Sequence, residues 1–379
     1  MSDEGLDRLI GRLIWVGVRG AEPGDGVLDA ELQLAASAHA GGVIIFDVDV
    51  PERNRLMEAE SLADAAARAR APRNVRSPEQ VRRLTDHVRD RLGVDVVISV
   101  DQEGGRVSRL NAVRGFVELP GPREYAGLSE AERERAAVSL AGMCASAGCD
   151  LNLAPCVDVA INPDGPGHTA LGRSFGAEPR EVVRLAGEQV RALHGAGVGS
   201  TLKHFPGHGS ARGDSHFGLV DTTETFEREA ELAPYAELLS EGAGEERADV
   251  VMVSHLLHRG IDPELPCSLS ERAIGGLLRG ELGWEGLVMT DSLDMHAVAD
   301  RYGAGEAAVL ALRAGADVAL EANNLTHVAE CPAPRMHADI RAAVRRGDLT
   351  VDRLESAAAR LDGFWSSVRG RRSGAGVRP

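Results

Sequence analysis

Short runs of apolar residues recur along the chain, and longer stretches with helical periodicity separate them. The runs are rich in Val, Ile and Leu and do not alternate with polar residues, which is typical of strands buried on both faces of a parallel sheet. The pattern therefore predicts eight strands, at residues 13–18, 42–46, 96–100, 151–155, 198–202, 250–254, 287–290 and 317–320.

The stretches between the apolar runs predict helices. In residues 78–92, Val81, Leu84, Val88 and Leu92 recur at helical spacing. Further helices are expected at residues 129–147, 178–193, 226–239, 270–282 and 305–313. The repeated alternation of strand and helix favours an α/β fold of the closed (β/α)₈ TIM barrel type, and the open doubly wound sheet is the alternative.

The alternation predicts one barrel domain over residues 1–369, and two segments do not fit the repeat. Residues 51–76 are charged and rich in Ala, and we expect a helical or mobile excursion there after the second strand. Residues 370–379 consist mainly of Gly, Arg and Ser, a composition that predicts a disordered tail.

The charge balance and the cysteines change the expected partners and location. Lys and Arg total 42 against 58 Asp and Glu, so the formal net charge is −16. A chain with this charge repels phosphate backbones and anionic membranes, so we expect neither a nucleic-acid nor a membrane partner. Five cysteines without a Cys-x-x-Cys pair, and an amino terminus without a signal-peptide pattern, predict a reduced, cytoplasmic protein.

Polar and charged residues gather directly after five consecutive apolar runs. In a barrel that position is the carboxyl-terminal face of the strands, where active sites lie. The segments are Asp-Gln-Glu-Gly-Gly-Arg-Val-Ser-Arg at 101–109, Asp158 followed by Asn-Pro at 162–163 and Gly-Arg-Ser-Phe-Gly at 172–176, Lys-His-Phe-Pro-Gly-His-Gly at 203–209 with Asp-Ser-His at 214–216, Ser-His at 254–255, and Thr-Asp-Ser-Leu-Asp at 290–294.

Each of these residues also has a simpler interpretation. Asp101 or Asp291 can cap a following helix, and His204 or His255 can be a hydrogen-bonded structural residue. A further set can be read as metal ligands, but its spacing matches no common zinc pattern, so we expect no metal and no cofactor; the set is His204, His208, Asp214 and His216. The recurrence of charged and imidazole groups at five strand ends favours catalysis.

The residue types suit the cleavage of a glycosidic bond. A retaining glycosidase needs a carboxylate that attacks the anomeric carbon and a group that protonates the leaving oxygen. Asp291 follows a strand and can be held in a fixed position. Asp214 and His216 lie two residues apart, and a carboxylate beside an imidazole stabilises and orients its protonated form. Donors and acceptors for sugar hydroxyls are supplied by Lys203, Arg109, Arg173 and Asp101.

On these motifs the sequence resembles glycoside hydrolase family 3, and within it the single-domain β-N-acetylglucosaminidases. The resemblance covers nearly the whole chain and implies a barrel that needs no second α/β domain. It implies that Asp291 is the nucleophile, His216 the general acid/base and Asp214 its partner. It also implies that sugar is bound by Asp101, Arg109, Arg173, Lys203 and His204.

Three segments depart from the family pattern and leave the natural substrate open. Phe-Asp-Val-Asp at 46–49 replaces Phe-x-Arg-Asn, the 162–173 loop is longer, and Asp-Ser-Leu follows the seventh strand where Asp-Asp-Leu is common. The main hypothesis is an exo-β-N-acetylglucosaminidase of cell-wall fragment turnover. The alternatives are a related glycosidase or phosphorylase for another amino-sugar glycoside, an inactive sugar-binding protein, and a metal-dependent hydrolase.

Overall fold

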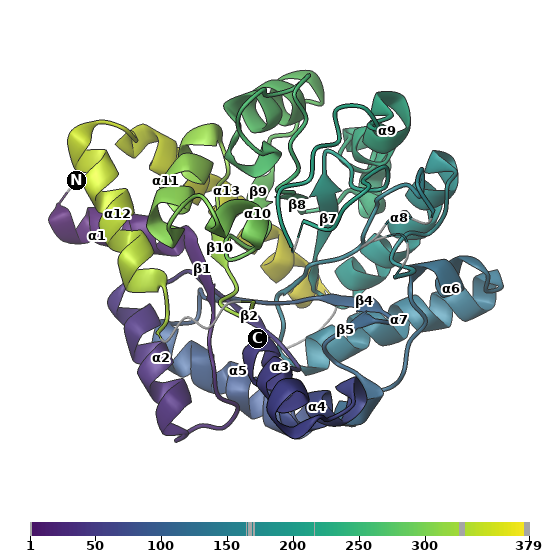
Figure 1. Ribbon diagram of the computed structural model, residues 1–379, viewed down its shortest axis with the longest axis horizontal. Helices are drawn as coiled ribbons and strands as arrows, with labels where there is room; N and C mark the ends of the chain where they lie inside the picture. Colours follow the sequence, from purple (N-terminus) through teal and green to yellow (C-terminus); the bar gives the residue numbers. More distant parts are fainter. Residues whose placement is uncertain are drawn as a thin grey trace.

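The computed structural model describes residues 2–163, 165, 169, 171–215, 217–325 and 330–374. Within them, eight parallel strands form one sheet in the order β10-β1-β2-β3-β6-β7-β8-β9 (Figure 1). A parallel bridge between Met289 and Val318 joins the two outer strands, so the sheet closes into a barrel. The strands are β1 (Ile14–Gly17), β2 (Gly42–Ile45), β3 (Val97–Val100), β6 (Leu151–Asn152), β7 (Gly199–Phe205), β8 (Val250–Val253), β9 (Leu287–Thr290) and β10 (Ala319–Glu321).

The (β/α)₈ barrel predicted from the apolar runs is therefore confirmed, and the open sheet is excluded. Each predicted run contains one of the eight strands or overlaps it. β7 extends three residues beyond the predicted end, because its last residues keep parallel pairing with β8 as far as Phe205 and Val253. A short hairpin of β4 (Gln102–Gly104) and β5 (Val107–Ser108) follows β3 and was not predicted.

Helices surround the barrel, and the sequence predicted most of those that follow a strand. Residues 270–282 differ, since they form a π-helix instead of an α-helix. The helices are α1 (Asp3–Arg12), α2 (Gly26–Ser37), α3 (Val50–Glu60), α4 (Asp64–Arg70), α5 (Pro78–Leu92), η1 (Ala112–Arg114), α6 (Pro122–Ala126), α7 (Glu130–Ser146), α8 (Pro179–Gly195), α9 (Arg228–Leu238), η2 (Glu241–Glu246), η3 (Cys267–Leu269), η4 (Arg272–Glu281), α10 (His296–Ala299), α11 (Ala304–Ala314), α12 (Ala333–Arg346) and α13 (Val351–Gly374).

The long helix α13 closes the amino-terminal end of the barrel. Leu361, Phe364, Trp365 and Val368 on its inner face belong to one buried cluster with apolar residues of the strands. The indole N–H of Trp365 donates to the carbonyl of Asp95, just before β3 (3.0 Å). The barrel is thus sealed at this end, and a ligand must enter from the opposite one.

The prediction of a disordered tail from residue 370 is wrong for its first five residues. α13 continues to Gly374 because two arginines on its last turns bind aspartates that precede β6 and β8. Arg372 lies 2.9 Å from Asp150, and Arg371 lies 2.7 Å from Asp249. Residues 375–379 lie outside the described part of the chain.

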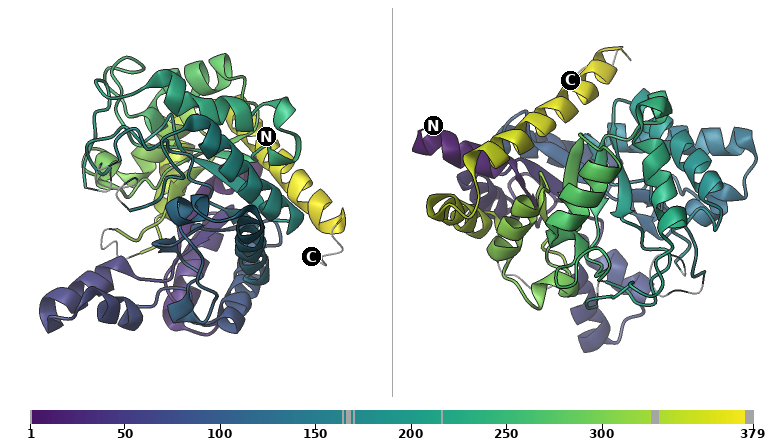
Figure 2. Two further views of the ribbon diagram at one scale, coloured as in Figure 1. Left: turned by 90° about the vertical axis from the view of Figure 1, so that its right-hand side faces the viewer. Right: turned by 90° about the horizontal axis from the view of Figure 1, so that it is seen from above.

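The excursion predicted at 51–76 is helical. It forms the pair α3 and α4, which projects from the carboxyl-terminal side of the barrel, away from α13 (Figure 2). Most of the α3–α4 surface is exposed, but its two ends meet, since the N–H of Asp49 donates to the carbonyl of Ala71 (2.9 Å).

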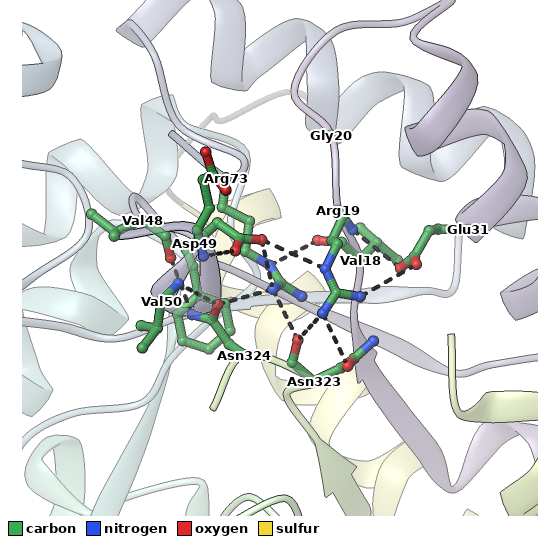
Figure 3. A network of polar contacts seen from close by, with 12 residues as sticks. Val18, Arg19, Gly20, Glu31, Val48, Asp49, Val50, Arg73, Asn323 and Asn324 are labelled. Carbon is green, nitrogen blue, oxygen red and sulfur yellow. Dashed lines mark hydrogen bonds and ion pairs between the residues drawn. The ribbon is translucent and has the colours of Figure 1, made fainter. Parts of the chain in front are cut away.

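A polar network fixes the base of this helical pair to the barrel rim (Figure 3). Asn324, just after β10, donates to the carbonyl of Val48 (3.1 Å) and accepts from the N–H of Val50 (3.2 Å). The buried guanidinium of Arg73 donates to Asn324 Oδ1 (2.9 Å) and lies 3.6 Å from the carboxylate of Asp49. Because buried polar groups here are paired with one another, the α3–α4 pair is held in one position beside the strand ends.

None of the described helices has both the length and the apolar character that a bilayer crossing requires.

Candidate active site

A cavity of about 250 Å³ opens at the carboxyl-terminal ends of the strands. Its volume lies near the lower end of the range for ligand pockets, about 300 Å³, so it suits a small ligand. Among the residues that line it are Asp101, Arg109, Arg173, Lys203, His204 and Asp291, which are all five predicted sugar-binding residues and the predicted nucleophile. The strand ends thus bring together residues that are up to 190 positions apart in the chain.

A chain of alternating charges forms one wall of the cavity. Lys203 Nζ donates to Asp101 Oδ1 (2.7 Å) and also lies 2.7 Å from Glu103 Oε1. Arg173 binds the same Glu103 through two hydrogen bonds, of 2.9 and 2.7 Å. Arg109 lies 3.6 Å from Asp101 and stacks over the ring of Phe46, 5.3 Å from its centroid. The five charges alternate in sign, so these contacts hold the three cations and the two carboxylates in place.

These contacts hold the carboxylates of the wall in their ionised form. Burial by itself raises the pKa of Asp101, but the charges of Lys203 and Arg109 outweigh it and lower that pKa. Burial also opposes ionisation of Glu103, and Arg173 and Lys203 outweigh it and lower the pKa of Glu103 to about 2. At neutral pH Asp101 therefore presents acceptors to the cavity, and Arg173 and Lys203 present donors.

His204 is oriented by two neighbours. Its Nε2 lies 3.3 Å from Arg173 Nη2, and because a guanidinium can only donate, Nε2 is the acceptor. The proton therefore sits on Nδ1, which donates to Asp158 Oδ2 (2.7 Å). The other oxygen of Asp158 accepts the backbone N–H groups of His204 (3.1 Å) and His208 (2.9 Å). The buried Asp158 thus fixes both the imidazole and the loop that follows β7.

Asp291 lies at the first position after β9, and its side chain faces the cavity. Its N–H donates to the carbonyl of Val253 (2.9 Å), and its Oδ1 accepts from the N–H of Ser292 (2.7 Å). The hydroxyl of Ser292 accepts from the N–H of Ala322 (2.8 Å) and donates to the carboxylate of Asp294. A carboxylate held in this way keeps one orientation toward a ligand.

His255 has a structural role, as the simpler of its two interpretations predicted. Its ring nitrogens contact Ser268 Oγ (2.6 Å) and the carbonyl of Ser292 (2.7 Å), and its side chain is buried. His255 therefore supports the turn that carries Asp291.

The loop with the predicted acid/base pair is described only in part. His216 lies outside the described residues, and Asp214 is not among the residues that line the cavity. The neighbouring residues are anchored, since His208 Nε2 lies 3.2 Å from the hydroxyl of Ser215. Burial lowers the pKa of His208 to about 4, so this imidazole is neutral at neutral pH. The pairing of Asp214 with His216 stays a prediction.

Glu231 on α9 supports the loop that follows β7. Its buried carboxylate accepts the N–H groups of Gly209 (3.1 Å) and Glu227 (3.3 Å). Gly207 has a φ of +143°, and a side chain there would meet Glu231 at 2.6 Å, so this close approach requires glycine. Burial raises the pKa of Glu231 to about 7.

Three carboxylates support the site although no site role was predicted for them: Glu103, Asp158 and Asp294. All three stand in the polar segments that follow predicted strands, and that position was a usable signal. The role of Asp158 depends on the packing of β6 against β7, which the sequence does not display.

A closed barrel with fixed carboxylates, cations and an imidazole at its carboxyl-terminal face defines a barrel enzyme for a small, hydroxyl-rich ligand. The model of the glycosyl hydrolase family 3 N-terminal domain matches residues 10–363. The chain belongs to this family and is a glycoside hydrolase.

Named relatives agree with this family. A β-hexosaminidase from Pseudomonas aeruginosa is 37% identical over 260 residues, which are 66% of this chain and 73% of that protein. The β-hexosaminidase LpqI from Mycobacterium tuberculosis is 37% identical over 276 residues, which are 70% of this chain and 67% of that protein. A family 3 β-N-acetylglucosaminidase structure from Paenibacillus sp. has a TM-score of 0.78 and 32% identity, over 96% of this chain and 62% of that one. This chain thus spans less than two thirds of that solved structure.

Proposed function

We propose that this protein is a retaining exo-β-N-acetylglucosaminidase that acts through a covalent glycosyl-enzyme. The observation that carries the proposal is the cavity in which Asp291 faces the ion-paired wall of Asp101, Lys203 and Arg173. The names of the relatives, which are β-hexosaminidases and a β-N-acetylglucosaminidase, supply the sugar.

In this proposal Asp291 is the nucleophile. Its carboxylate attacks the anomeric carbon of the bound sugar, the bond to the leaving oxygen breaks, and an ester of Asp291 forms. Water then hydrolyses this ester with overall retention of configuration. The contact from the N–H of Ser292 keeps the carboxylate aimed at the cavity throughout.

His216 is proposed as the general acid/base and Asp214 as its partner. His216 gives its proton to the leaving oxygen in the first step and takes one from water in the second. Asp158 and Glu231 anchor the residues that lead into this loop, through the N–H groups of His208 and Gly209. The loop therefore starts from a rigid base.

The remaining predicted residues are proposed to bind the sugar. Asp101 accepts from hydroxyl groups, and Arg173, Lys203 and Arg109 donate to them, without prior reorganisation because the ion pairs hold them in place. A cavity of about 250 Å³ favours a single terminal sugar over an extended chain, which is consistent with exo action.

The wider setting is also a proposal. The setting proposed is turnover of cell-wall amino-sugar fragments in the cytoplasm, and the acidic charge of the chain disfavours binding to an anionic membrane. The net charge of −16 disfavours a nucleic-acid partner.

The test is a comparison of kcat/KM for β-N-acetylglucosaminide and β-glucoside with the same aryl leaving group. A site that hydrogen-bonds the acetamido group should favour the first by at least about a hundredfold. Equal values would contradict the amino-sugar assignment. The same assay with added phosphate separates hydrolysis from phosphorolysis, because only phosphorolysis yields sugar 1-phosphate. Activity that survives chelation excludes a metal-dependent hydrolase.

A further inference from the structure

Three buried side chains with metal-binding atoms meet directly beneath the cavity. Cys156, Asp158 and His204 are exposed by 3% or less, and their ligand atoms all lie within 4.8 Å of one another. Asp158 Oδ2 is the common neighbour, at 3.2 Å from Cys156 Sγ and 2.7 Å from His204 Nδ1. This set differs from the histidine set that the sequence suggested, and it contains a thiol.

The hydrogen-bonding pattern of the cluster resembles that of a zinc site with protons in place of the metal. The thiol and the Nδ1–H group both donate to one carboxylate oxygen, so two protons lie among the three ligand atoms. Thiolate, imidazole and carboxylate are the three ligand types that Zn²⁺ prefers. Three protein ligands leave the fourth tetrahedral position to water.

We propose that Zn²⁺, or another thiophilic divalent cation, binds Cys156 Sγ, Asp158 Oδ2 and His204 Nδ1 and inhibits the enzyme. On binding, the S–H bond breaks and its proton leaves to solvent, the Nδ1 proton of His204 moves to Nε2, and Zn–S, Zn–N and Zn–O bonds form. Nε2 then carries a proton and no longer accepts from Arg173 Nη2. Two positive charges enter and one leaves, and the thiolate of Cys156 and the carboxylate of Asp158 together balance the charge of the ion.

Inhibition follows from the position of the ligands. His204 lines the cavity, and its Nε2 contacts Arg173. Asp158 holds the backbone of His204 and His208. Metal–ligand bonds of about 2.0 to 2.3 Å at tetrahedral angles place the ligand atoms more than about 3 Å apart. Asp158 Oδ2 and His204 Nδ1, which are now 2.7 Å apart, must therefore separate, so the sugar-binding wall and the base of the loop after β7 both shift.

The first experiment measures binding alone, and its result is independent of the proposed hydrolase activity. Co²⁺ is titrated into the metal-free full-length protein, and the near-ultraviolet absorption of a thiolate–cobalt bond is recorded. We expect one equivalent of Co²⁺ to produce the band in the wild type and in Cys267→Ser, whose thiol is equally buried but lies outside the cluster. Cys156→Ser keeps a hydrogen-bond donor to Asp158 and removes the soft ligand, so its band should be absent. A wild type without the band, or a Cys156→Ser variant that keeps it, would overturn the site.

The second experiment concerns inhibition and rests on the proposed function. The inhibition constant for Zn²⁺ is measured with an aryl β-N-acetylglucosaminide for the wild type, Cys156→Ser and Cys267→Ser. Loss of a ligand should raise the constant at least tenfold in Cys156→Ser only, with kcat/KM in the absence of metal and the melting temperature close to wild type. Equal inhibition of Cys156→Ser means that zinc acts elsewhere. A wild type that fails to hydrolyse any glycoside contradicts the proposed function and leaves the cobalt result standing.

Discussion

Replacing Glu103 by Gln should strongly destabilise the folded protein. Glu103 is buried, and its carboxylate joins Arg173 and Lys203. In Glu103→Gln the Arg173 guanidinium loses its ion pair, and the Lys203 ammonium keeps only the one with Asp101 among those described. Removing one partner from a buried ion pair costs about 3 to 5 kcal/mol.

The pKa of Glu103 gives an independent magnitude. It is about 2 in the folded protein and ordinarily 4.5, which corresponds to about 3 kcal/mol of stability. Because the folded pKa is the lower one, this stabilisation is fully present above pH 4.5 and is lost as the pH falls toward 2. For a chain of 379 residues the unfolding entropy is about 0.8 kcal/mol/K, so the melting temperature should fall by about 4 °C.

The assay is urea unfolding of wild type and Glu103→Gln at pH 7 and at pH 3, followed by circular dichroism. The variant should lose about 3 kcal/mol at pH 7 and clearly less at pH 3, where the wild type has begun to lose the contribution. Glu52→Gln is the matched control, since Glu52 binds Arg55 on the exposed face of α3 at 2.7 Å, and it should cost less than about 0.5 kcal/mol. A loss below about 0.5 kcal/mol for Glu103→Gln at pH 7 would refute the reasoning.

Further predictions concern other parts of the molecule. Burial raises the pKa of Glu231 from 4.5 to about 7, so the folded state binds the proton more tightly than the unfolded state. The free energy of unfolding should therefore fall as the pH rises between these values. In Glu231→Gln the free energy of unfolding should lack this pH dependence, and a profile identical to wild type would contradict the prediction. Asn324→Ala removes three hydrogen bonds at the base of α3, to Val48, Val50 and Arg73. It should cost about 2 to 3 kcal/mol and speed proteolysis within residues 50–71, whereas an unchanged rate of proteolysis would mean that other contacts hold the base. His216→Ala should lose most activity on substrates with poor leaving groups and regain turnover with azide; a kcat/KM loss independent of leaving-group pKa would assign the proton to another residue.

The order of elements was predictable because strands buried on both faces leave unbroken apolar runs in the sequence. The positions of Asp101, Lys203 and Asp291 followed from the same runs, since residues after a barrel strand share one rim. Element ends were harder to predict. The last turns of α13 depend on ion pairs with Asp150 and Asp249, residues more than a hundred positions away.

The roles of the carboxylates that support the site were not predictable from local pattern, although their positions after strands were visible in the sequence. Asp158 acts through backbone N–H groups of the next strand, and that contact exists only after β6 and β7 have paired. Cys156 looked like one of five ordinary thiols, and only the folded chain brings its sulfur beside Asp158. The motif that contains Lys203 and His204 indicated the site, and the groups that fix it come from elsewhere in the sequence.

The most direct test of the account is identification of the residue that carries the sugar in the glycosyl-enzyme. The enzyme is incubated with a ring-fluorinated N-acetylglucosaminyl fluoride, whose glycosyl-enzyme intermediate hydrolyses slowly. The protein is then digested, and the masses of its peptides are measured by mass spectrometry. The account predicts one added sugar on the peptide that contains Asp291, attached to that carboxylate, and no label in Asp291→Asn. A sugar attached to a different residue would contradict the account. Turnover of Asp291→Asn within about tenfold of wild type would also contradict it, because that rate corresponds to a barrier difference of only about 1.4 kcal/mol.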